Sequence, residues 1–288
     1  SGLVGSEMCI RDRVKVLVNG IGYNATEAEA IMSVVSTWGQ KINMIIASIS
    51  TGLMVSLIPH LTASFVKKDM DDVKKKINQT IQWSLFFTIP MTFGLSVLAK
   101  PVWTFFYGVS KFGPSVYQYY VFVALATTLF TASVTILQLL KEYKQVFICL
   151  LTGLLTNALL NIPLLYAFHN MGLPAYYGST TSTILGYFAC SYLALRYIGN
   201  KYKISYEETI KRVINIFLIT LVMVICLLIM KYIFPITTTS KILNMLYVLL
   251  FSGIGVVIYF TIMFKSRLVY DIFGRGNIEK IFNKLKRR

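Results

Sequence analysis

The chain has 288 residues, of which 56% are hydrophobic and only 14% are charged, and its mean hydropathy is +0.64. A soluble domain would carry about a quarter charged residues, so this composition excludes an ordinary soluble protein. The net charge of +16 does not indicate nucleic-acid binding, because most basic residues lie in short segments between long apolar runs.

The apolar runs are roughly twenty residues or longer, which is enough to cross a bilayer as helices. They are apolar on most faces, whereas strands of a membrane barrel would be about ten residues of alternating polarity. A helix also satisfies its backbone polar groups within the segment, as lipid requires. The predicted fold class is therefore all-α, a polytopic transmembrane helical bundle.

The first thirteen residues, SGLVGSEMCIRDR, form a polar and irregular stretch. They lack the basic region and apolar core of a signal peptide. They closely resemble the translated sequencing-adaptor read-through found at the ends of metagenomic gene predictions. We therefore expect residues 1–13 to be an artefact, the native frame to begin near Val14, and an N-terminal part to be missing. A natural short hydrophilic start is the alternative.

The first predicted helix begins with Asn24 and Glu27, which have the spacing of a capping box. This helix leads into the first of about seven apolar spans. The second span contains Pro90 and Pro101. The predicted spans cover residues 42–66, 77–106, 115–140, 145–168, 173–198, 213–234 and 242–264.

The basic residues alternate between the two ends of these spans and predict the orientation of the chain. The loops after the first, third and fifth spans, and the tail after the seventh, are rich in lysine and arginine. Cytoplasmic loops carry such an excess, so residues 14–265 form one membrane domain and 266–288 a basic cytoplasmic tail. An odd number of spans then places the start of this domain outside.

The tail also has the spacing of an amphipathic helix suited to an anionic membrane surface. The residues that give this spacing are Ile278, Ile281, Phe282 and Leu285. An ordinary positive-inside tail is the alternative.

The residue types that usually carry catalysis are not grouped in this sequence. All 12 acidic residues lie outside the apolar runs, so no span offers paired carboxylates for acid–base chemistry or ion coupling. His60 and His169 are far apart, the four cysteines show no disulfide or metal spacing, and no nucleotide-binding motif occurs. We predict that the protein is not an enzyme and has no catalytic residue, cofactor or metal.

The exception to this lack of candidate functional groups is Lys41, at the outer end of the first apolar run. Trp38 lies three residues earlier and shares its helical face. Gln40 and Asn43 belong to an adjacent polar stripe. An ionisable residue in a span is by default a candidate for a substrate path, so we predict Lys41, Gln40 and Asn43 as substrate-binding residues. A lysine that snorkels to the outer interface is the alternative.

Other polar stripes predict helix faces that avoid lipid. Gly153, Asn157 and Asn161 recur every four residues, and 178–183 form a small, hydroxyl-rich helix start. Such residues allow close helix packing, and a hydrophilic cavity is the more specific interpretation, under which Asn157 binds substrate. Residues 213–230 contain almost nothing polar, which predicts a peripheral helix that faces lipid.

Three segments resemble a known transporter superfamily. GYNATEAEAIMSVVSTWGQKINMIIASISTGLMVSLIPHLTASFVKKD resembles the eighth-helix region of multidrug/oligosaccharidyl-lipid/polysaccharide exporters, most closely their MurJ-type and SpoVB-like branches. IPMTFGLSVLAKPVWTFFYG resembles their ninth helix, and LLTGLLTNALLNIPLLYAFHNMGLPAYYGSTTST their eleventh and twelfth. The resemblance covers essentially all of 14–288.

This resemblance implies one lobe of a two-lobed, fourteen-helix flippase that works by alternating access, with this chain as helices eight to fourteen. In the MurJ-like branch a basic residue of the eighth helix meets the substrate's pyrophosphate, and Lys41 lies close to that position. The family residue is typically arginine, and lysine offers a point charge instead of a bidentate fork.

We therefore expect a flippase of a lipid-linked cell-wall or polysaccharide precursor in the bacterial plasma membrane. The expected partners are a lipid-linked oligosaccharide or lipid II, membrane lipids and the missing N-terminal lobe, with no nucleic acid. A drug/cation antiporter of the same superfamily and a membrane-embedded polysaccharide enzyme are the alternatives. The antiporter would need a carboxylate in the missing half, and the enzyme a large extracytoplasmic loop.

Overall fold

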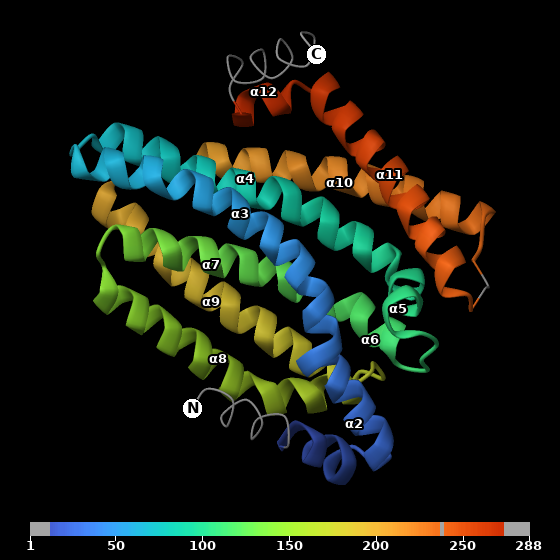
Figure 1. The fold of residues 1–288 in the computed structure, drawn as a ribbon. Helices are drawn as coiled ribbons and strands as arrows, with labels where there is room; N and C mark the ends of the chain where they lie inside the picture. The colour runs from blue at the N-terminus through green and yellow to red at the C-terminus, as the bar shows by residue number, and fades with distance from the viewer. Residues whose placement is uncertain (1–11, 237–238, 274–288) are drawn as a thin grey trace.

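The computed structural model describes residues 12–236 and 239–273, and Figure 1 shows how they are arranged. Within these ranges the regular structure is entirely helical, which confirms the predicted fold class. The elements are η1 (Val16–Gly20), α2 (Ala25–Ser33), η2 (Val34–Trp38), α3 (Gly39–Val66), α4 (Met70–Val97), α5 (Ala99–Tyr107), α6 (Gly113–Tyr120), α7 (Val123–Leu139), α8 (Tyr143–Asn170), α9 (Tyr176–Tyr202), α10 (Glu207–Ile233), α11 (Lys241–Lys265) and α12 (Leu268–Phe273). The symbols η1 and η2 mark single π-helical turns.

The long helices lie side by side in an order that differs from their order in the chain. α8 packs on α9, α9 on α7, and α7 on both α3 and α4. α4 also contacts α10, which contacts α11. Figure 1 accordingly shows α8 at one edge of the bundle and α11 at the other. α4 therefore contacts helices on both sides of the bundle, α7 on one side and α10 and α11 on the other.

Five of the described helical segments are long and apolar enough to cross a membrane: Ala25–Val66, Gly113–Leu139, Tyr143–Asn170, Glu207–Ile233 and Lys241–Lys265. The pair α4–α5 is a sixth candidate, and its two helices meet at an angle of 80°. α9 is 27 residues long but does not meet the same criterion. It lies between α8 and α7 and buries small polar side chains there, which lowers its hydropathy. Its membrane crossing therefore stays a prediction.

The segment predicted as the second span, 77–106, is divided between two helices, and its membrane crossing stays a prediction. α4 ends at Val97 and α5 begins at Ala99, with the 80° bend between them. Pro101 contributes to this break, because it has no N–H to donate to the Val97 carbonyl four residues earlier. Lys231 of α10 donates to that carbonyl instead, at 2.9 Å. The bend is therefore also an attachment point for α10.

Pro90 creates a second attachment point in the same way. It lies inside α4 and leaves the Phe86 carbonyl without its helical donor. The Tyr259 hydroxyl of α11 donates to this carbonyl at 2.8 Å, and the two aromatic rings pack edge to face with centroids 5.5 Å apart. Two carbonyls freed by prolines thus hold α10 and α11 against the α4–α5 pair.

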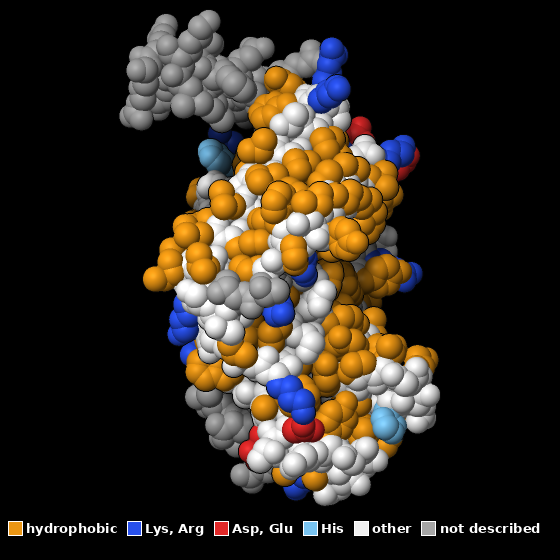
Figure 2. Space-filling model, turned by 90° about the vertical axis from the view of Figure 1, so that its right-hand side faces the viewer, with side chains coloured by type: hydrophobic (Ala, Val, Ile, Leu, Met, Phe, Trp, Pro, Cys, Tyr) orange, Lys and Arg blue, Asp and Glu red, His pale blue; other side chains and the backbone are white. Residues whose placement is uncertain are grey.

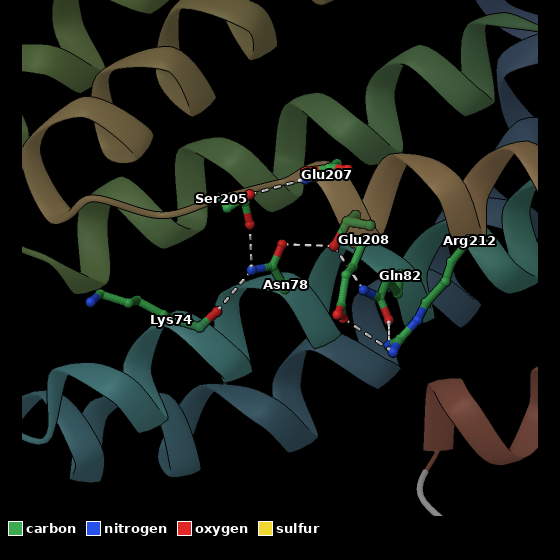
Figure 3. A network of polar contacts seen from close by, with 8 residues as sticks. Lys74, Asn78, Gln82, Ser205, Glu207, Glu208 and Arg212 are labelled. Atoms are coloured by element: carbon green, nitrogen blue, oxygen red, sulfur yellow. Dashed lines mark hydrogen bonds and ion pairs between the residues drawn. The ribbon is translucent and has the colours of Figure 1, made fainter.

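Polar side chains also join the first half of α4 to the start of α10 (Figure 3). Thr209 donates to Asn78 Oδ1 and accepts from Gln82 Nε2, both at 2.7 Å. Arg212 donates to Gln82 Oε1 at 2.9 Å and pairs with Glu208 at 3.4 Å. Gln82 and Thr209 are buried, so these bonds satisfy groups that have no access to water.

The opposite face of α10 is exposed and apolar, as the sequence predicts for a peripheral helix. Its exposed side chains include Ile210, Ile214, Leu218, Ile225, Leu228 and Ile229. Figure 2 shows hydrophobic side chains spread over a broad area of the molecular surface. An exposed apolar area of this kind is expected where a protein contacts lipid.

Two smaller predictions concern the ends of the chain. Asn24 occupies the N-cap of α2, but its side chain makes no capping hydrogen bond, so the predicted capping box is not formed. The amphipathic helix predicted from Ile278 to Leu285 lies outside the described residues.

Candidate functional site

The candidate site is built around α3, and a π-helical turn precedes this helix. The turn, η2, connects α2 to α3, and single π-helical turns within helices are frequent at functional sites. Gly39 follows directly: a Cβ atom there would lie 2.8 Å from Tyr120 Cδ1 and 2.8 Å from the Val34 oxygen. Only glycine fits at this position without a shift of its neighbours. Gly39 therefore allows the close packing of α3 directly before Gln40 and Lys41.

A partly polar cavity of about 700 Å³, which we call the polar cavity, lies on one side of α3. Residues from α2, η2, α3, α6, α7, α8 and α9 line it. The uncharged polar ones are Ser36, Gln40, Asn43, Tyr120, Thr127, Asn157, Thr183 and Tyr187. Three of the four predicted substrate-binding residues are therefore brought together here. Arg13 also lines this cavity, but it belongs to the stretch expected to be an artefact, and we assign it no role.

Asn43 is held in place by contacts with α6. It is buried, its Nδ2 donates to the Tyr120 carbonyl at 3.4 Å, and its Oδ1 accepts from the Tyr117 hydroxyl at 3.4 Å. These are long hydrogen bonds, so Asn43 both joins α3 to α6 and keeps polar atoms at the cavity wall.

Asn157 serves the contact between α8 and α9 as well as the cavity. Its Oδ1 accepts from Ser182 Oγ at 3.0 Å. Nearby, a Cβ on Gly153 would lie 2.9 Å from the Gly186 oxygen, and one on Gly186 would lie 2.7 Å from the Gly153 oxygen. The two helices meet backbone to backbone, which is the close packing that the sequence predicts for this stripe.

Lys41 does not line the polar cavity. Its side chain is exposed, and its Nζ lies 4.7 Å from the centroid of the Trp38 ring, a cation–π contact between residues three apart on one helical face. Among the described residues no carboxylate forms an ion pair with it. Its positive charge is thus available to a ligand that approaches the exposed face of α3.

A second cavity, of about 590 Å³, lies on the other side of α3 and is almost wholly apolar. Ile42 and Ile45 of α3 contribute to it, together with residues of α4, α5, α10 and α11. The residues from these four helices include Phe87, Met91, Phe105, Phe106, Met223, Leu227, Val248 and Phe260. α3 therefore separates a polar space from an apolar one.

On the exposed face of α3, a row of small and polar residues follows Lys41 toward the C-terminal end of the helix. The sequence analysis did not single out these residues. Ser48, Thr51, Gly52 and Ser56 are all exposed, and a Cβ on Gly52 would meet nothing within 4 Å. Their spacing from Lys41 approximates the helical repeat, so this signal was present in the sequence. We call Lys41, Ser48, Gly52 and Ser56 the α3 stripe.

Comparison with known proteins agrees with this architecture. A family model described as Lipid II flippase MurJ matches residues 40–264. The chain belongs to the MurJ family. This assignment confirms the predicted resemblance and the predicted multi-pass helical membrane protein. The description of the family is that of a flippase, in agreement with the prediction that the protein is not an enzyme.

Two MurJ proteins show how much of the family's length the chain represents. It is 27% identical over 255 residues to the lipid II flippase MurJ of Bacillus subtilis (strain 168), covering 86% of this chain and 46% of that protein. A solved structure of lipid II flippase MurJ in an inward closed conformation has a TM-score of 0.50 and 16% identity, over 86% of this chain and 54% of that one. This likeness shows the fold. The chain spans about half the length of these MurJ proteins.

Proposed function

We propose that this MurJ-family chain is one lobe of a flippase that moves a lipid-linked cell-wall precursor, such as lipid II, across the bacterial plasma membrane by alternating access. The missing partner is an N-terminal lobe of the same protein. The basic loops and tail lie on the cytoplasmic side, following the positive-inside rule. The proposal rests on family membership and on half-length coverage of the curated relative.

The observation that carries this proposal is the pair of cavities on either side of α3. A lipid-linked precursor has a charged, sugar-bearing head and a hydrocarbon tail, and the two parts need different surroundings. The cavity lined by Gln40, Asn43 and Asn157 offers amide and hydroxyl groups, whereas the other offers almost only apolar side chains. A helix that separates the two kinds of space is suited to a substrate that needs both.

Lys41 is proposed to meet the phosphate groups that join head and tail. It lies on α3 at the boundary between the polar residues Gln40 and Asn43 and the apolar residues Ile42 and Ile45. Its Nζ has no carboxylate partner among the described residues, and its contact with Trp38 holds it at the helix surface. A cation at this position can bind a pyrophosphate as a point charge.

The test is genetic rescue by the full-length gene. Cells depleted of their lipid II flippase should grow when they express it, and the Lys41→Arg variant should also rescue them because it keeps the charge. Lys41→Gln should fail at equal expression. Lys100→Gln removes another exposed lysine from the predicted outer side and should rescue like the wild type.

Two outcomes would contradict these proposals at different levels. If the full-length wild type does not rescue despite normal expression, the assigned substrate is wrong. If the wild type and Lys41→Gln rescue equally well, the substrate assignment stands and the role of Lys41 is wrong.

A further inference from the structure

Four non-glycine residues of the described chain have a positive φ, and all four are basic. They are Lys68, Lys141, Lys203 and Arg267, with φ between 52° and 60°. L-residues disfavour this left-handed region, and glycine is the usual residue at such positions after a helix. We call these residues the αL cations.

Each αL cation lies one or two residues after the last residue of a helix: α3, α7, α9 or α11. These are the helices whose C-termini the basic-residue pattern predicts to be cytoplasmic. In contrast, the turn after α8, whose end is predicted to be outside, has Gly172 at the corresponding position, with a φ of 73° and its N–H donated to the His169 oxygen at 3.0 Å. This kind of turn is therefore closed by glycine after α8 and by a cation at the four helix ends predicted to be cytoplasmic.

Backbone hydrogen bonds close these turns and fix the backbone of the αL cations. Lys68, Lys141 and Arg267 each donate their backbone N–H to a carbonyl three residues earlier, at 3.0–3.1 Å. Lys203 is followed by Ile204, whose N–H bonds to the Gly199 oxygen at 3.0 Å. A basic side chain near a helix C-terminus also interacts favourably with the helix dipole, but Lys67 and Lys265 have that position with ordinary helical backbone. The dipole alone does not account for cations at left-handed positions.

The carboxylates that the structure describes in the loops on this side are already engaged. Asp69 accepts the backbone N–H of Asp72 as a helix cap. The other described carboxylates of these loops form the ion pairs Asp71–Lys74, Asp72–Lys76, Glu142–Lys201, Glu207–Lys211 and Glu208–Arg212. The αL cations are exposed and take part in none of these pairs. Their charges are left for an anion outside the chain.

The position of the αL cations identifies the kind of anion. Figure 1 shows the turns after α3, α7 and α9 at the same end of the bundle. Each cation comes within five residues of the end of its predicted apolar span: Lys68 follows the exposed Val66, and Arg267 follows Phe264. This is the depth at which a bilayer presents its phosphate groups.

We propose that the αL cations form a collar that binds the headgroups of anionic phospholipids in the cytoplasmic leaflet. Lysine and arginine at the membrane surface attract such lipids, and fixing their backbone in tight turns holds them at a constant depth. The proposal rests on the cytoplasmic orientation stated above, but it does not depend on which substrate is transported.

The test compares two sets of charge-removing variants of the full chain, purified in neutral detergent. The αL set is Lys68→Asn, Lys141→Asn, Lys203→Asn and Arg267→Asn, because asparagine tolerates the left-handed conformation. The matched set is Lys67→Asn, Lys75→Asn, Lys144→Asn and Lys265→Asn, which removes the same number of exposed charges from the same side. Bound phosphatidylglycerol is counted by native mass spectrometry, with phosphatidylcholine as the neutral control.

The αL set should lose roughly tenfold in phosphatidylglycerol binding, whereas the matched set should lose less than about twofold. Phosphatidylcholine binding should not change. Equal losses in the two sets would overturn the proposal, because net charge alone would then explain binding, and so would an unchanged αL set. If the asparagine variants do not fold, the four corresponding glycine variants decide the question, since glycine favours these turns.

Discussion

Two glycines of α3 have opposite surroundings, although both belong to the same long helix. Gly39 is buried at the first position, where a Cβ would press on Tyr120 and on the Val34 carbonyl. Gly52 lies on the exposed face, with nothing within 4 Å of a Cβ. Glycine is thus required by packing at one position, and at the other it leaves space in front of the α3 stripe.

This contrast gives a matched pair of predictions. Gly39→Ala should destabilise the fold by about 1–3 kcal/mol, because the clash involves a backbone oxygen that cannot rotate away. Gly52→Ala should stabilise it by about 0.5–1 kcal/mol, because alanine is the better helix former. Thermal unfolding of the purified chain in detergent measures both changes. A Gly39→Ala protein that melts at the wild-type temperature would show that η2 and α3 adjust more easily than this packing implies.

The residues of the site could be predicted from the sequence, but not which of them line the cavity and which lie on the exposed face of α3. The spacing of Gln40 and Asn43 and the polar character of Asn157 predicted a shared hydrophilic surface, and all three line one cavity. Lys41 was grouped with them, yet one residue turns a helix by about 100°, which carries its side chain onto the exposed stripe beside Trp38. Which face meets α7 and α9 depends on tertiary packing that spacing alone does not specify.

Two prolines explain how α10 and α11 are attached to the α4–α5 pair. Pro90 and Pro101 each free a carbonyl four residues earlier, and Tyr259 and Lys231 donate to these carbonyls. The chain remains helical through Pro90 but bends by 80° before Pro101. A proline therefore does not decide by itself whether a helix breaks. The packing of α5 against α11 and α6 adds the contacts that favour the bend.

A double-mutant cycle tests this account of Pro90. Tyr259→Phe should destabilise the chain by about 1–2 kcal/mol, because it removes the hydroxyl that donates to the buried Phe86 carbonyl. In the Pro90→Ala background the same change should cost much less, because the N–H of the new alanine can bond to Phe86. Chemical or thermal unfolding of the four proteins gives the coupling. If the cost of Tyr259→Phe is the same in both backgrounds, the hydroxyl does not replace a bond that the proline removed.

Helix bounds were predictable to within a few residues where charges bound an apolar run on both sides, as for α11. The break between α4 and α5 was not, because hydropathy continues across Leu98 and the donor from Lys231 is distant in sequence. α9 illustrates the opposite case. Its length agrees with the predicted segment 173–198. Its small polar residues contact α8, and they lower its hydropathy below that of its neighbours.

The whole molecule exposes two chemically different surfaces. α8 and α10 expose large apolar side chains, such as Leu154, Leu159 and Leu218, as expected for contact with lipid. The α3 stripe instead exposes a lysine, hydroxyls and a glycine. In a two-lobed transporter, a helix with such a face is suited to line the water-filled space between the lobes, since polar groups are disfavoured in hydrocarbon.

Thiol labelling of the full-length protein in membranes distinguishes these surfaces. Ser48→Cys and Leu159→Cys both place a thiol at an exposed position, while Ser50→Cys places one at a buried position next to Thr88. In a background without the native cysteines, a membrane-impermeant maleimide should react with Ser48→Cys roughly tenfold faster than with the other two, because only a hydrated thiol forms the reactive thiolate. Equal reaction of Ser48→Cys and Leu159→Cys would mean that the α3 stripe has the same surroundings as α8 and does not line an aqueous path. Bound substrate or its headgroup should slow the labelling of Ser48→Cys if the stripe lies on the transport route, and this protection should disappear in the Lys41→Gln background.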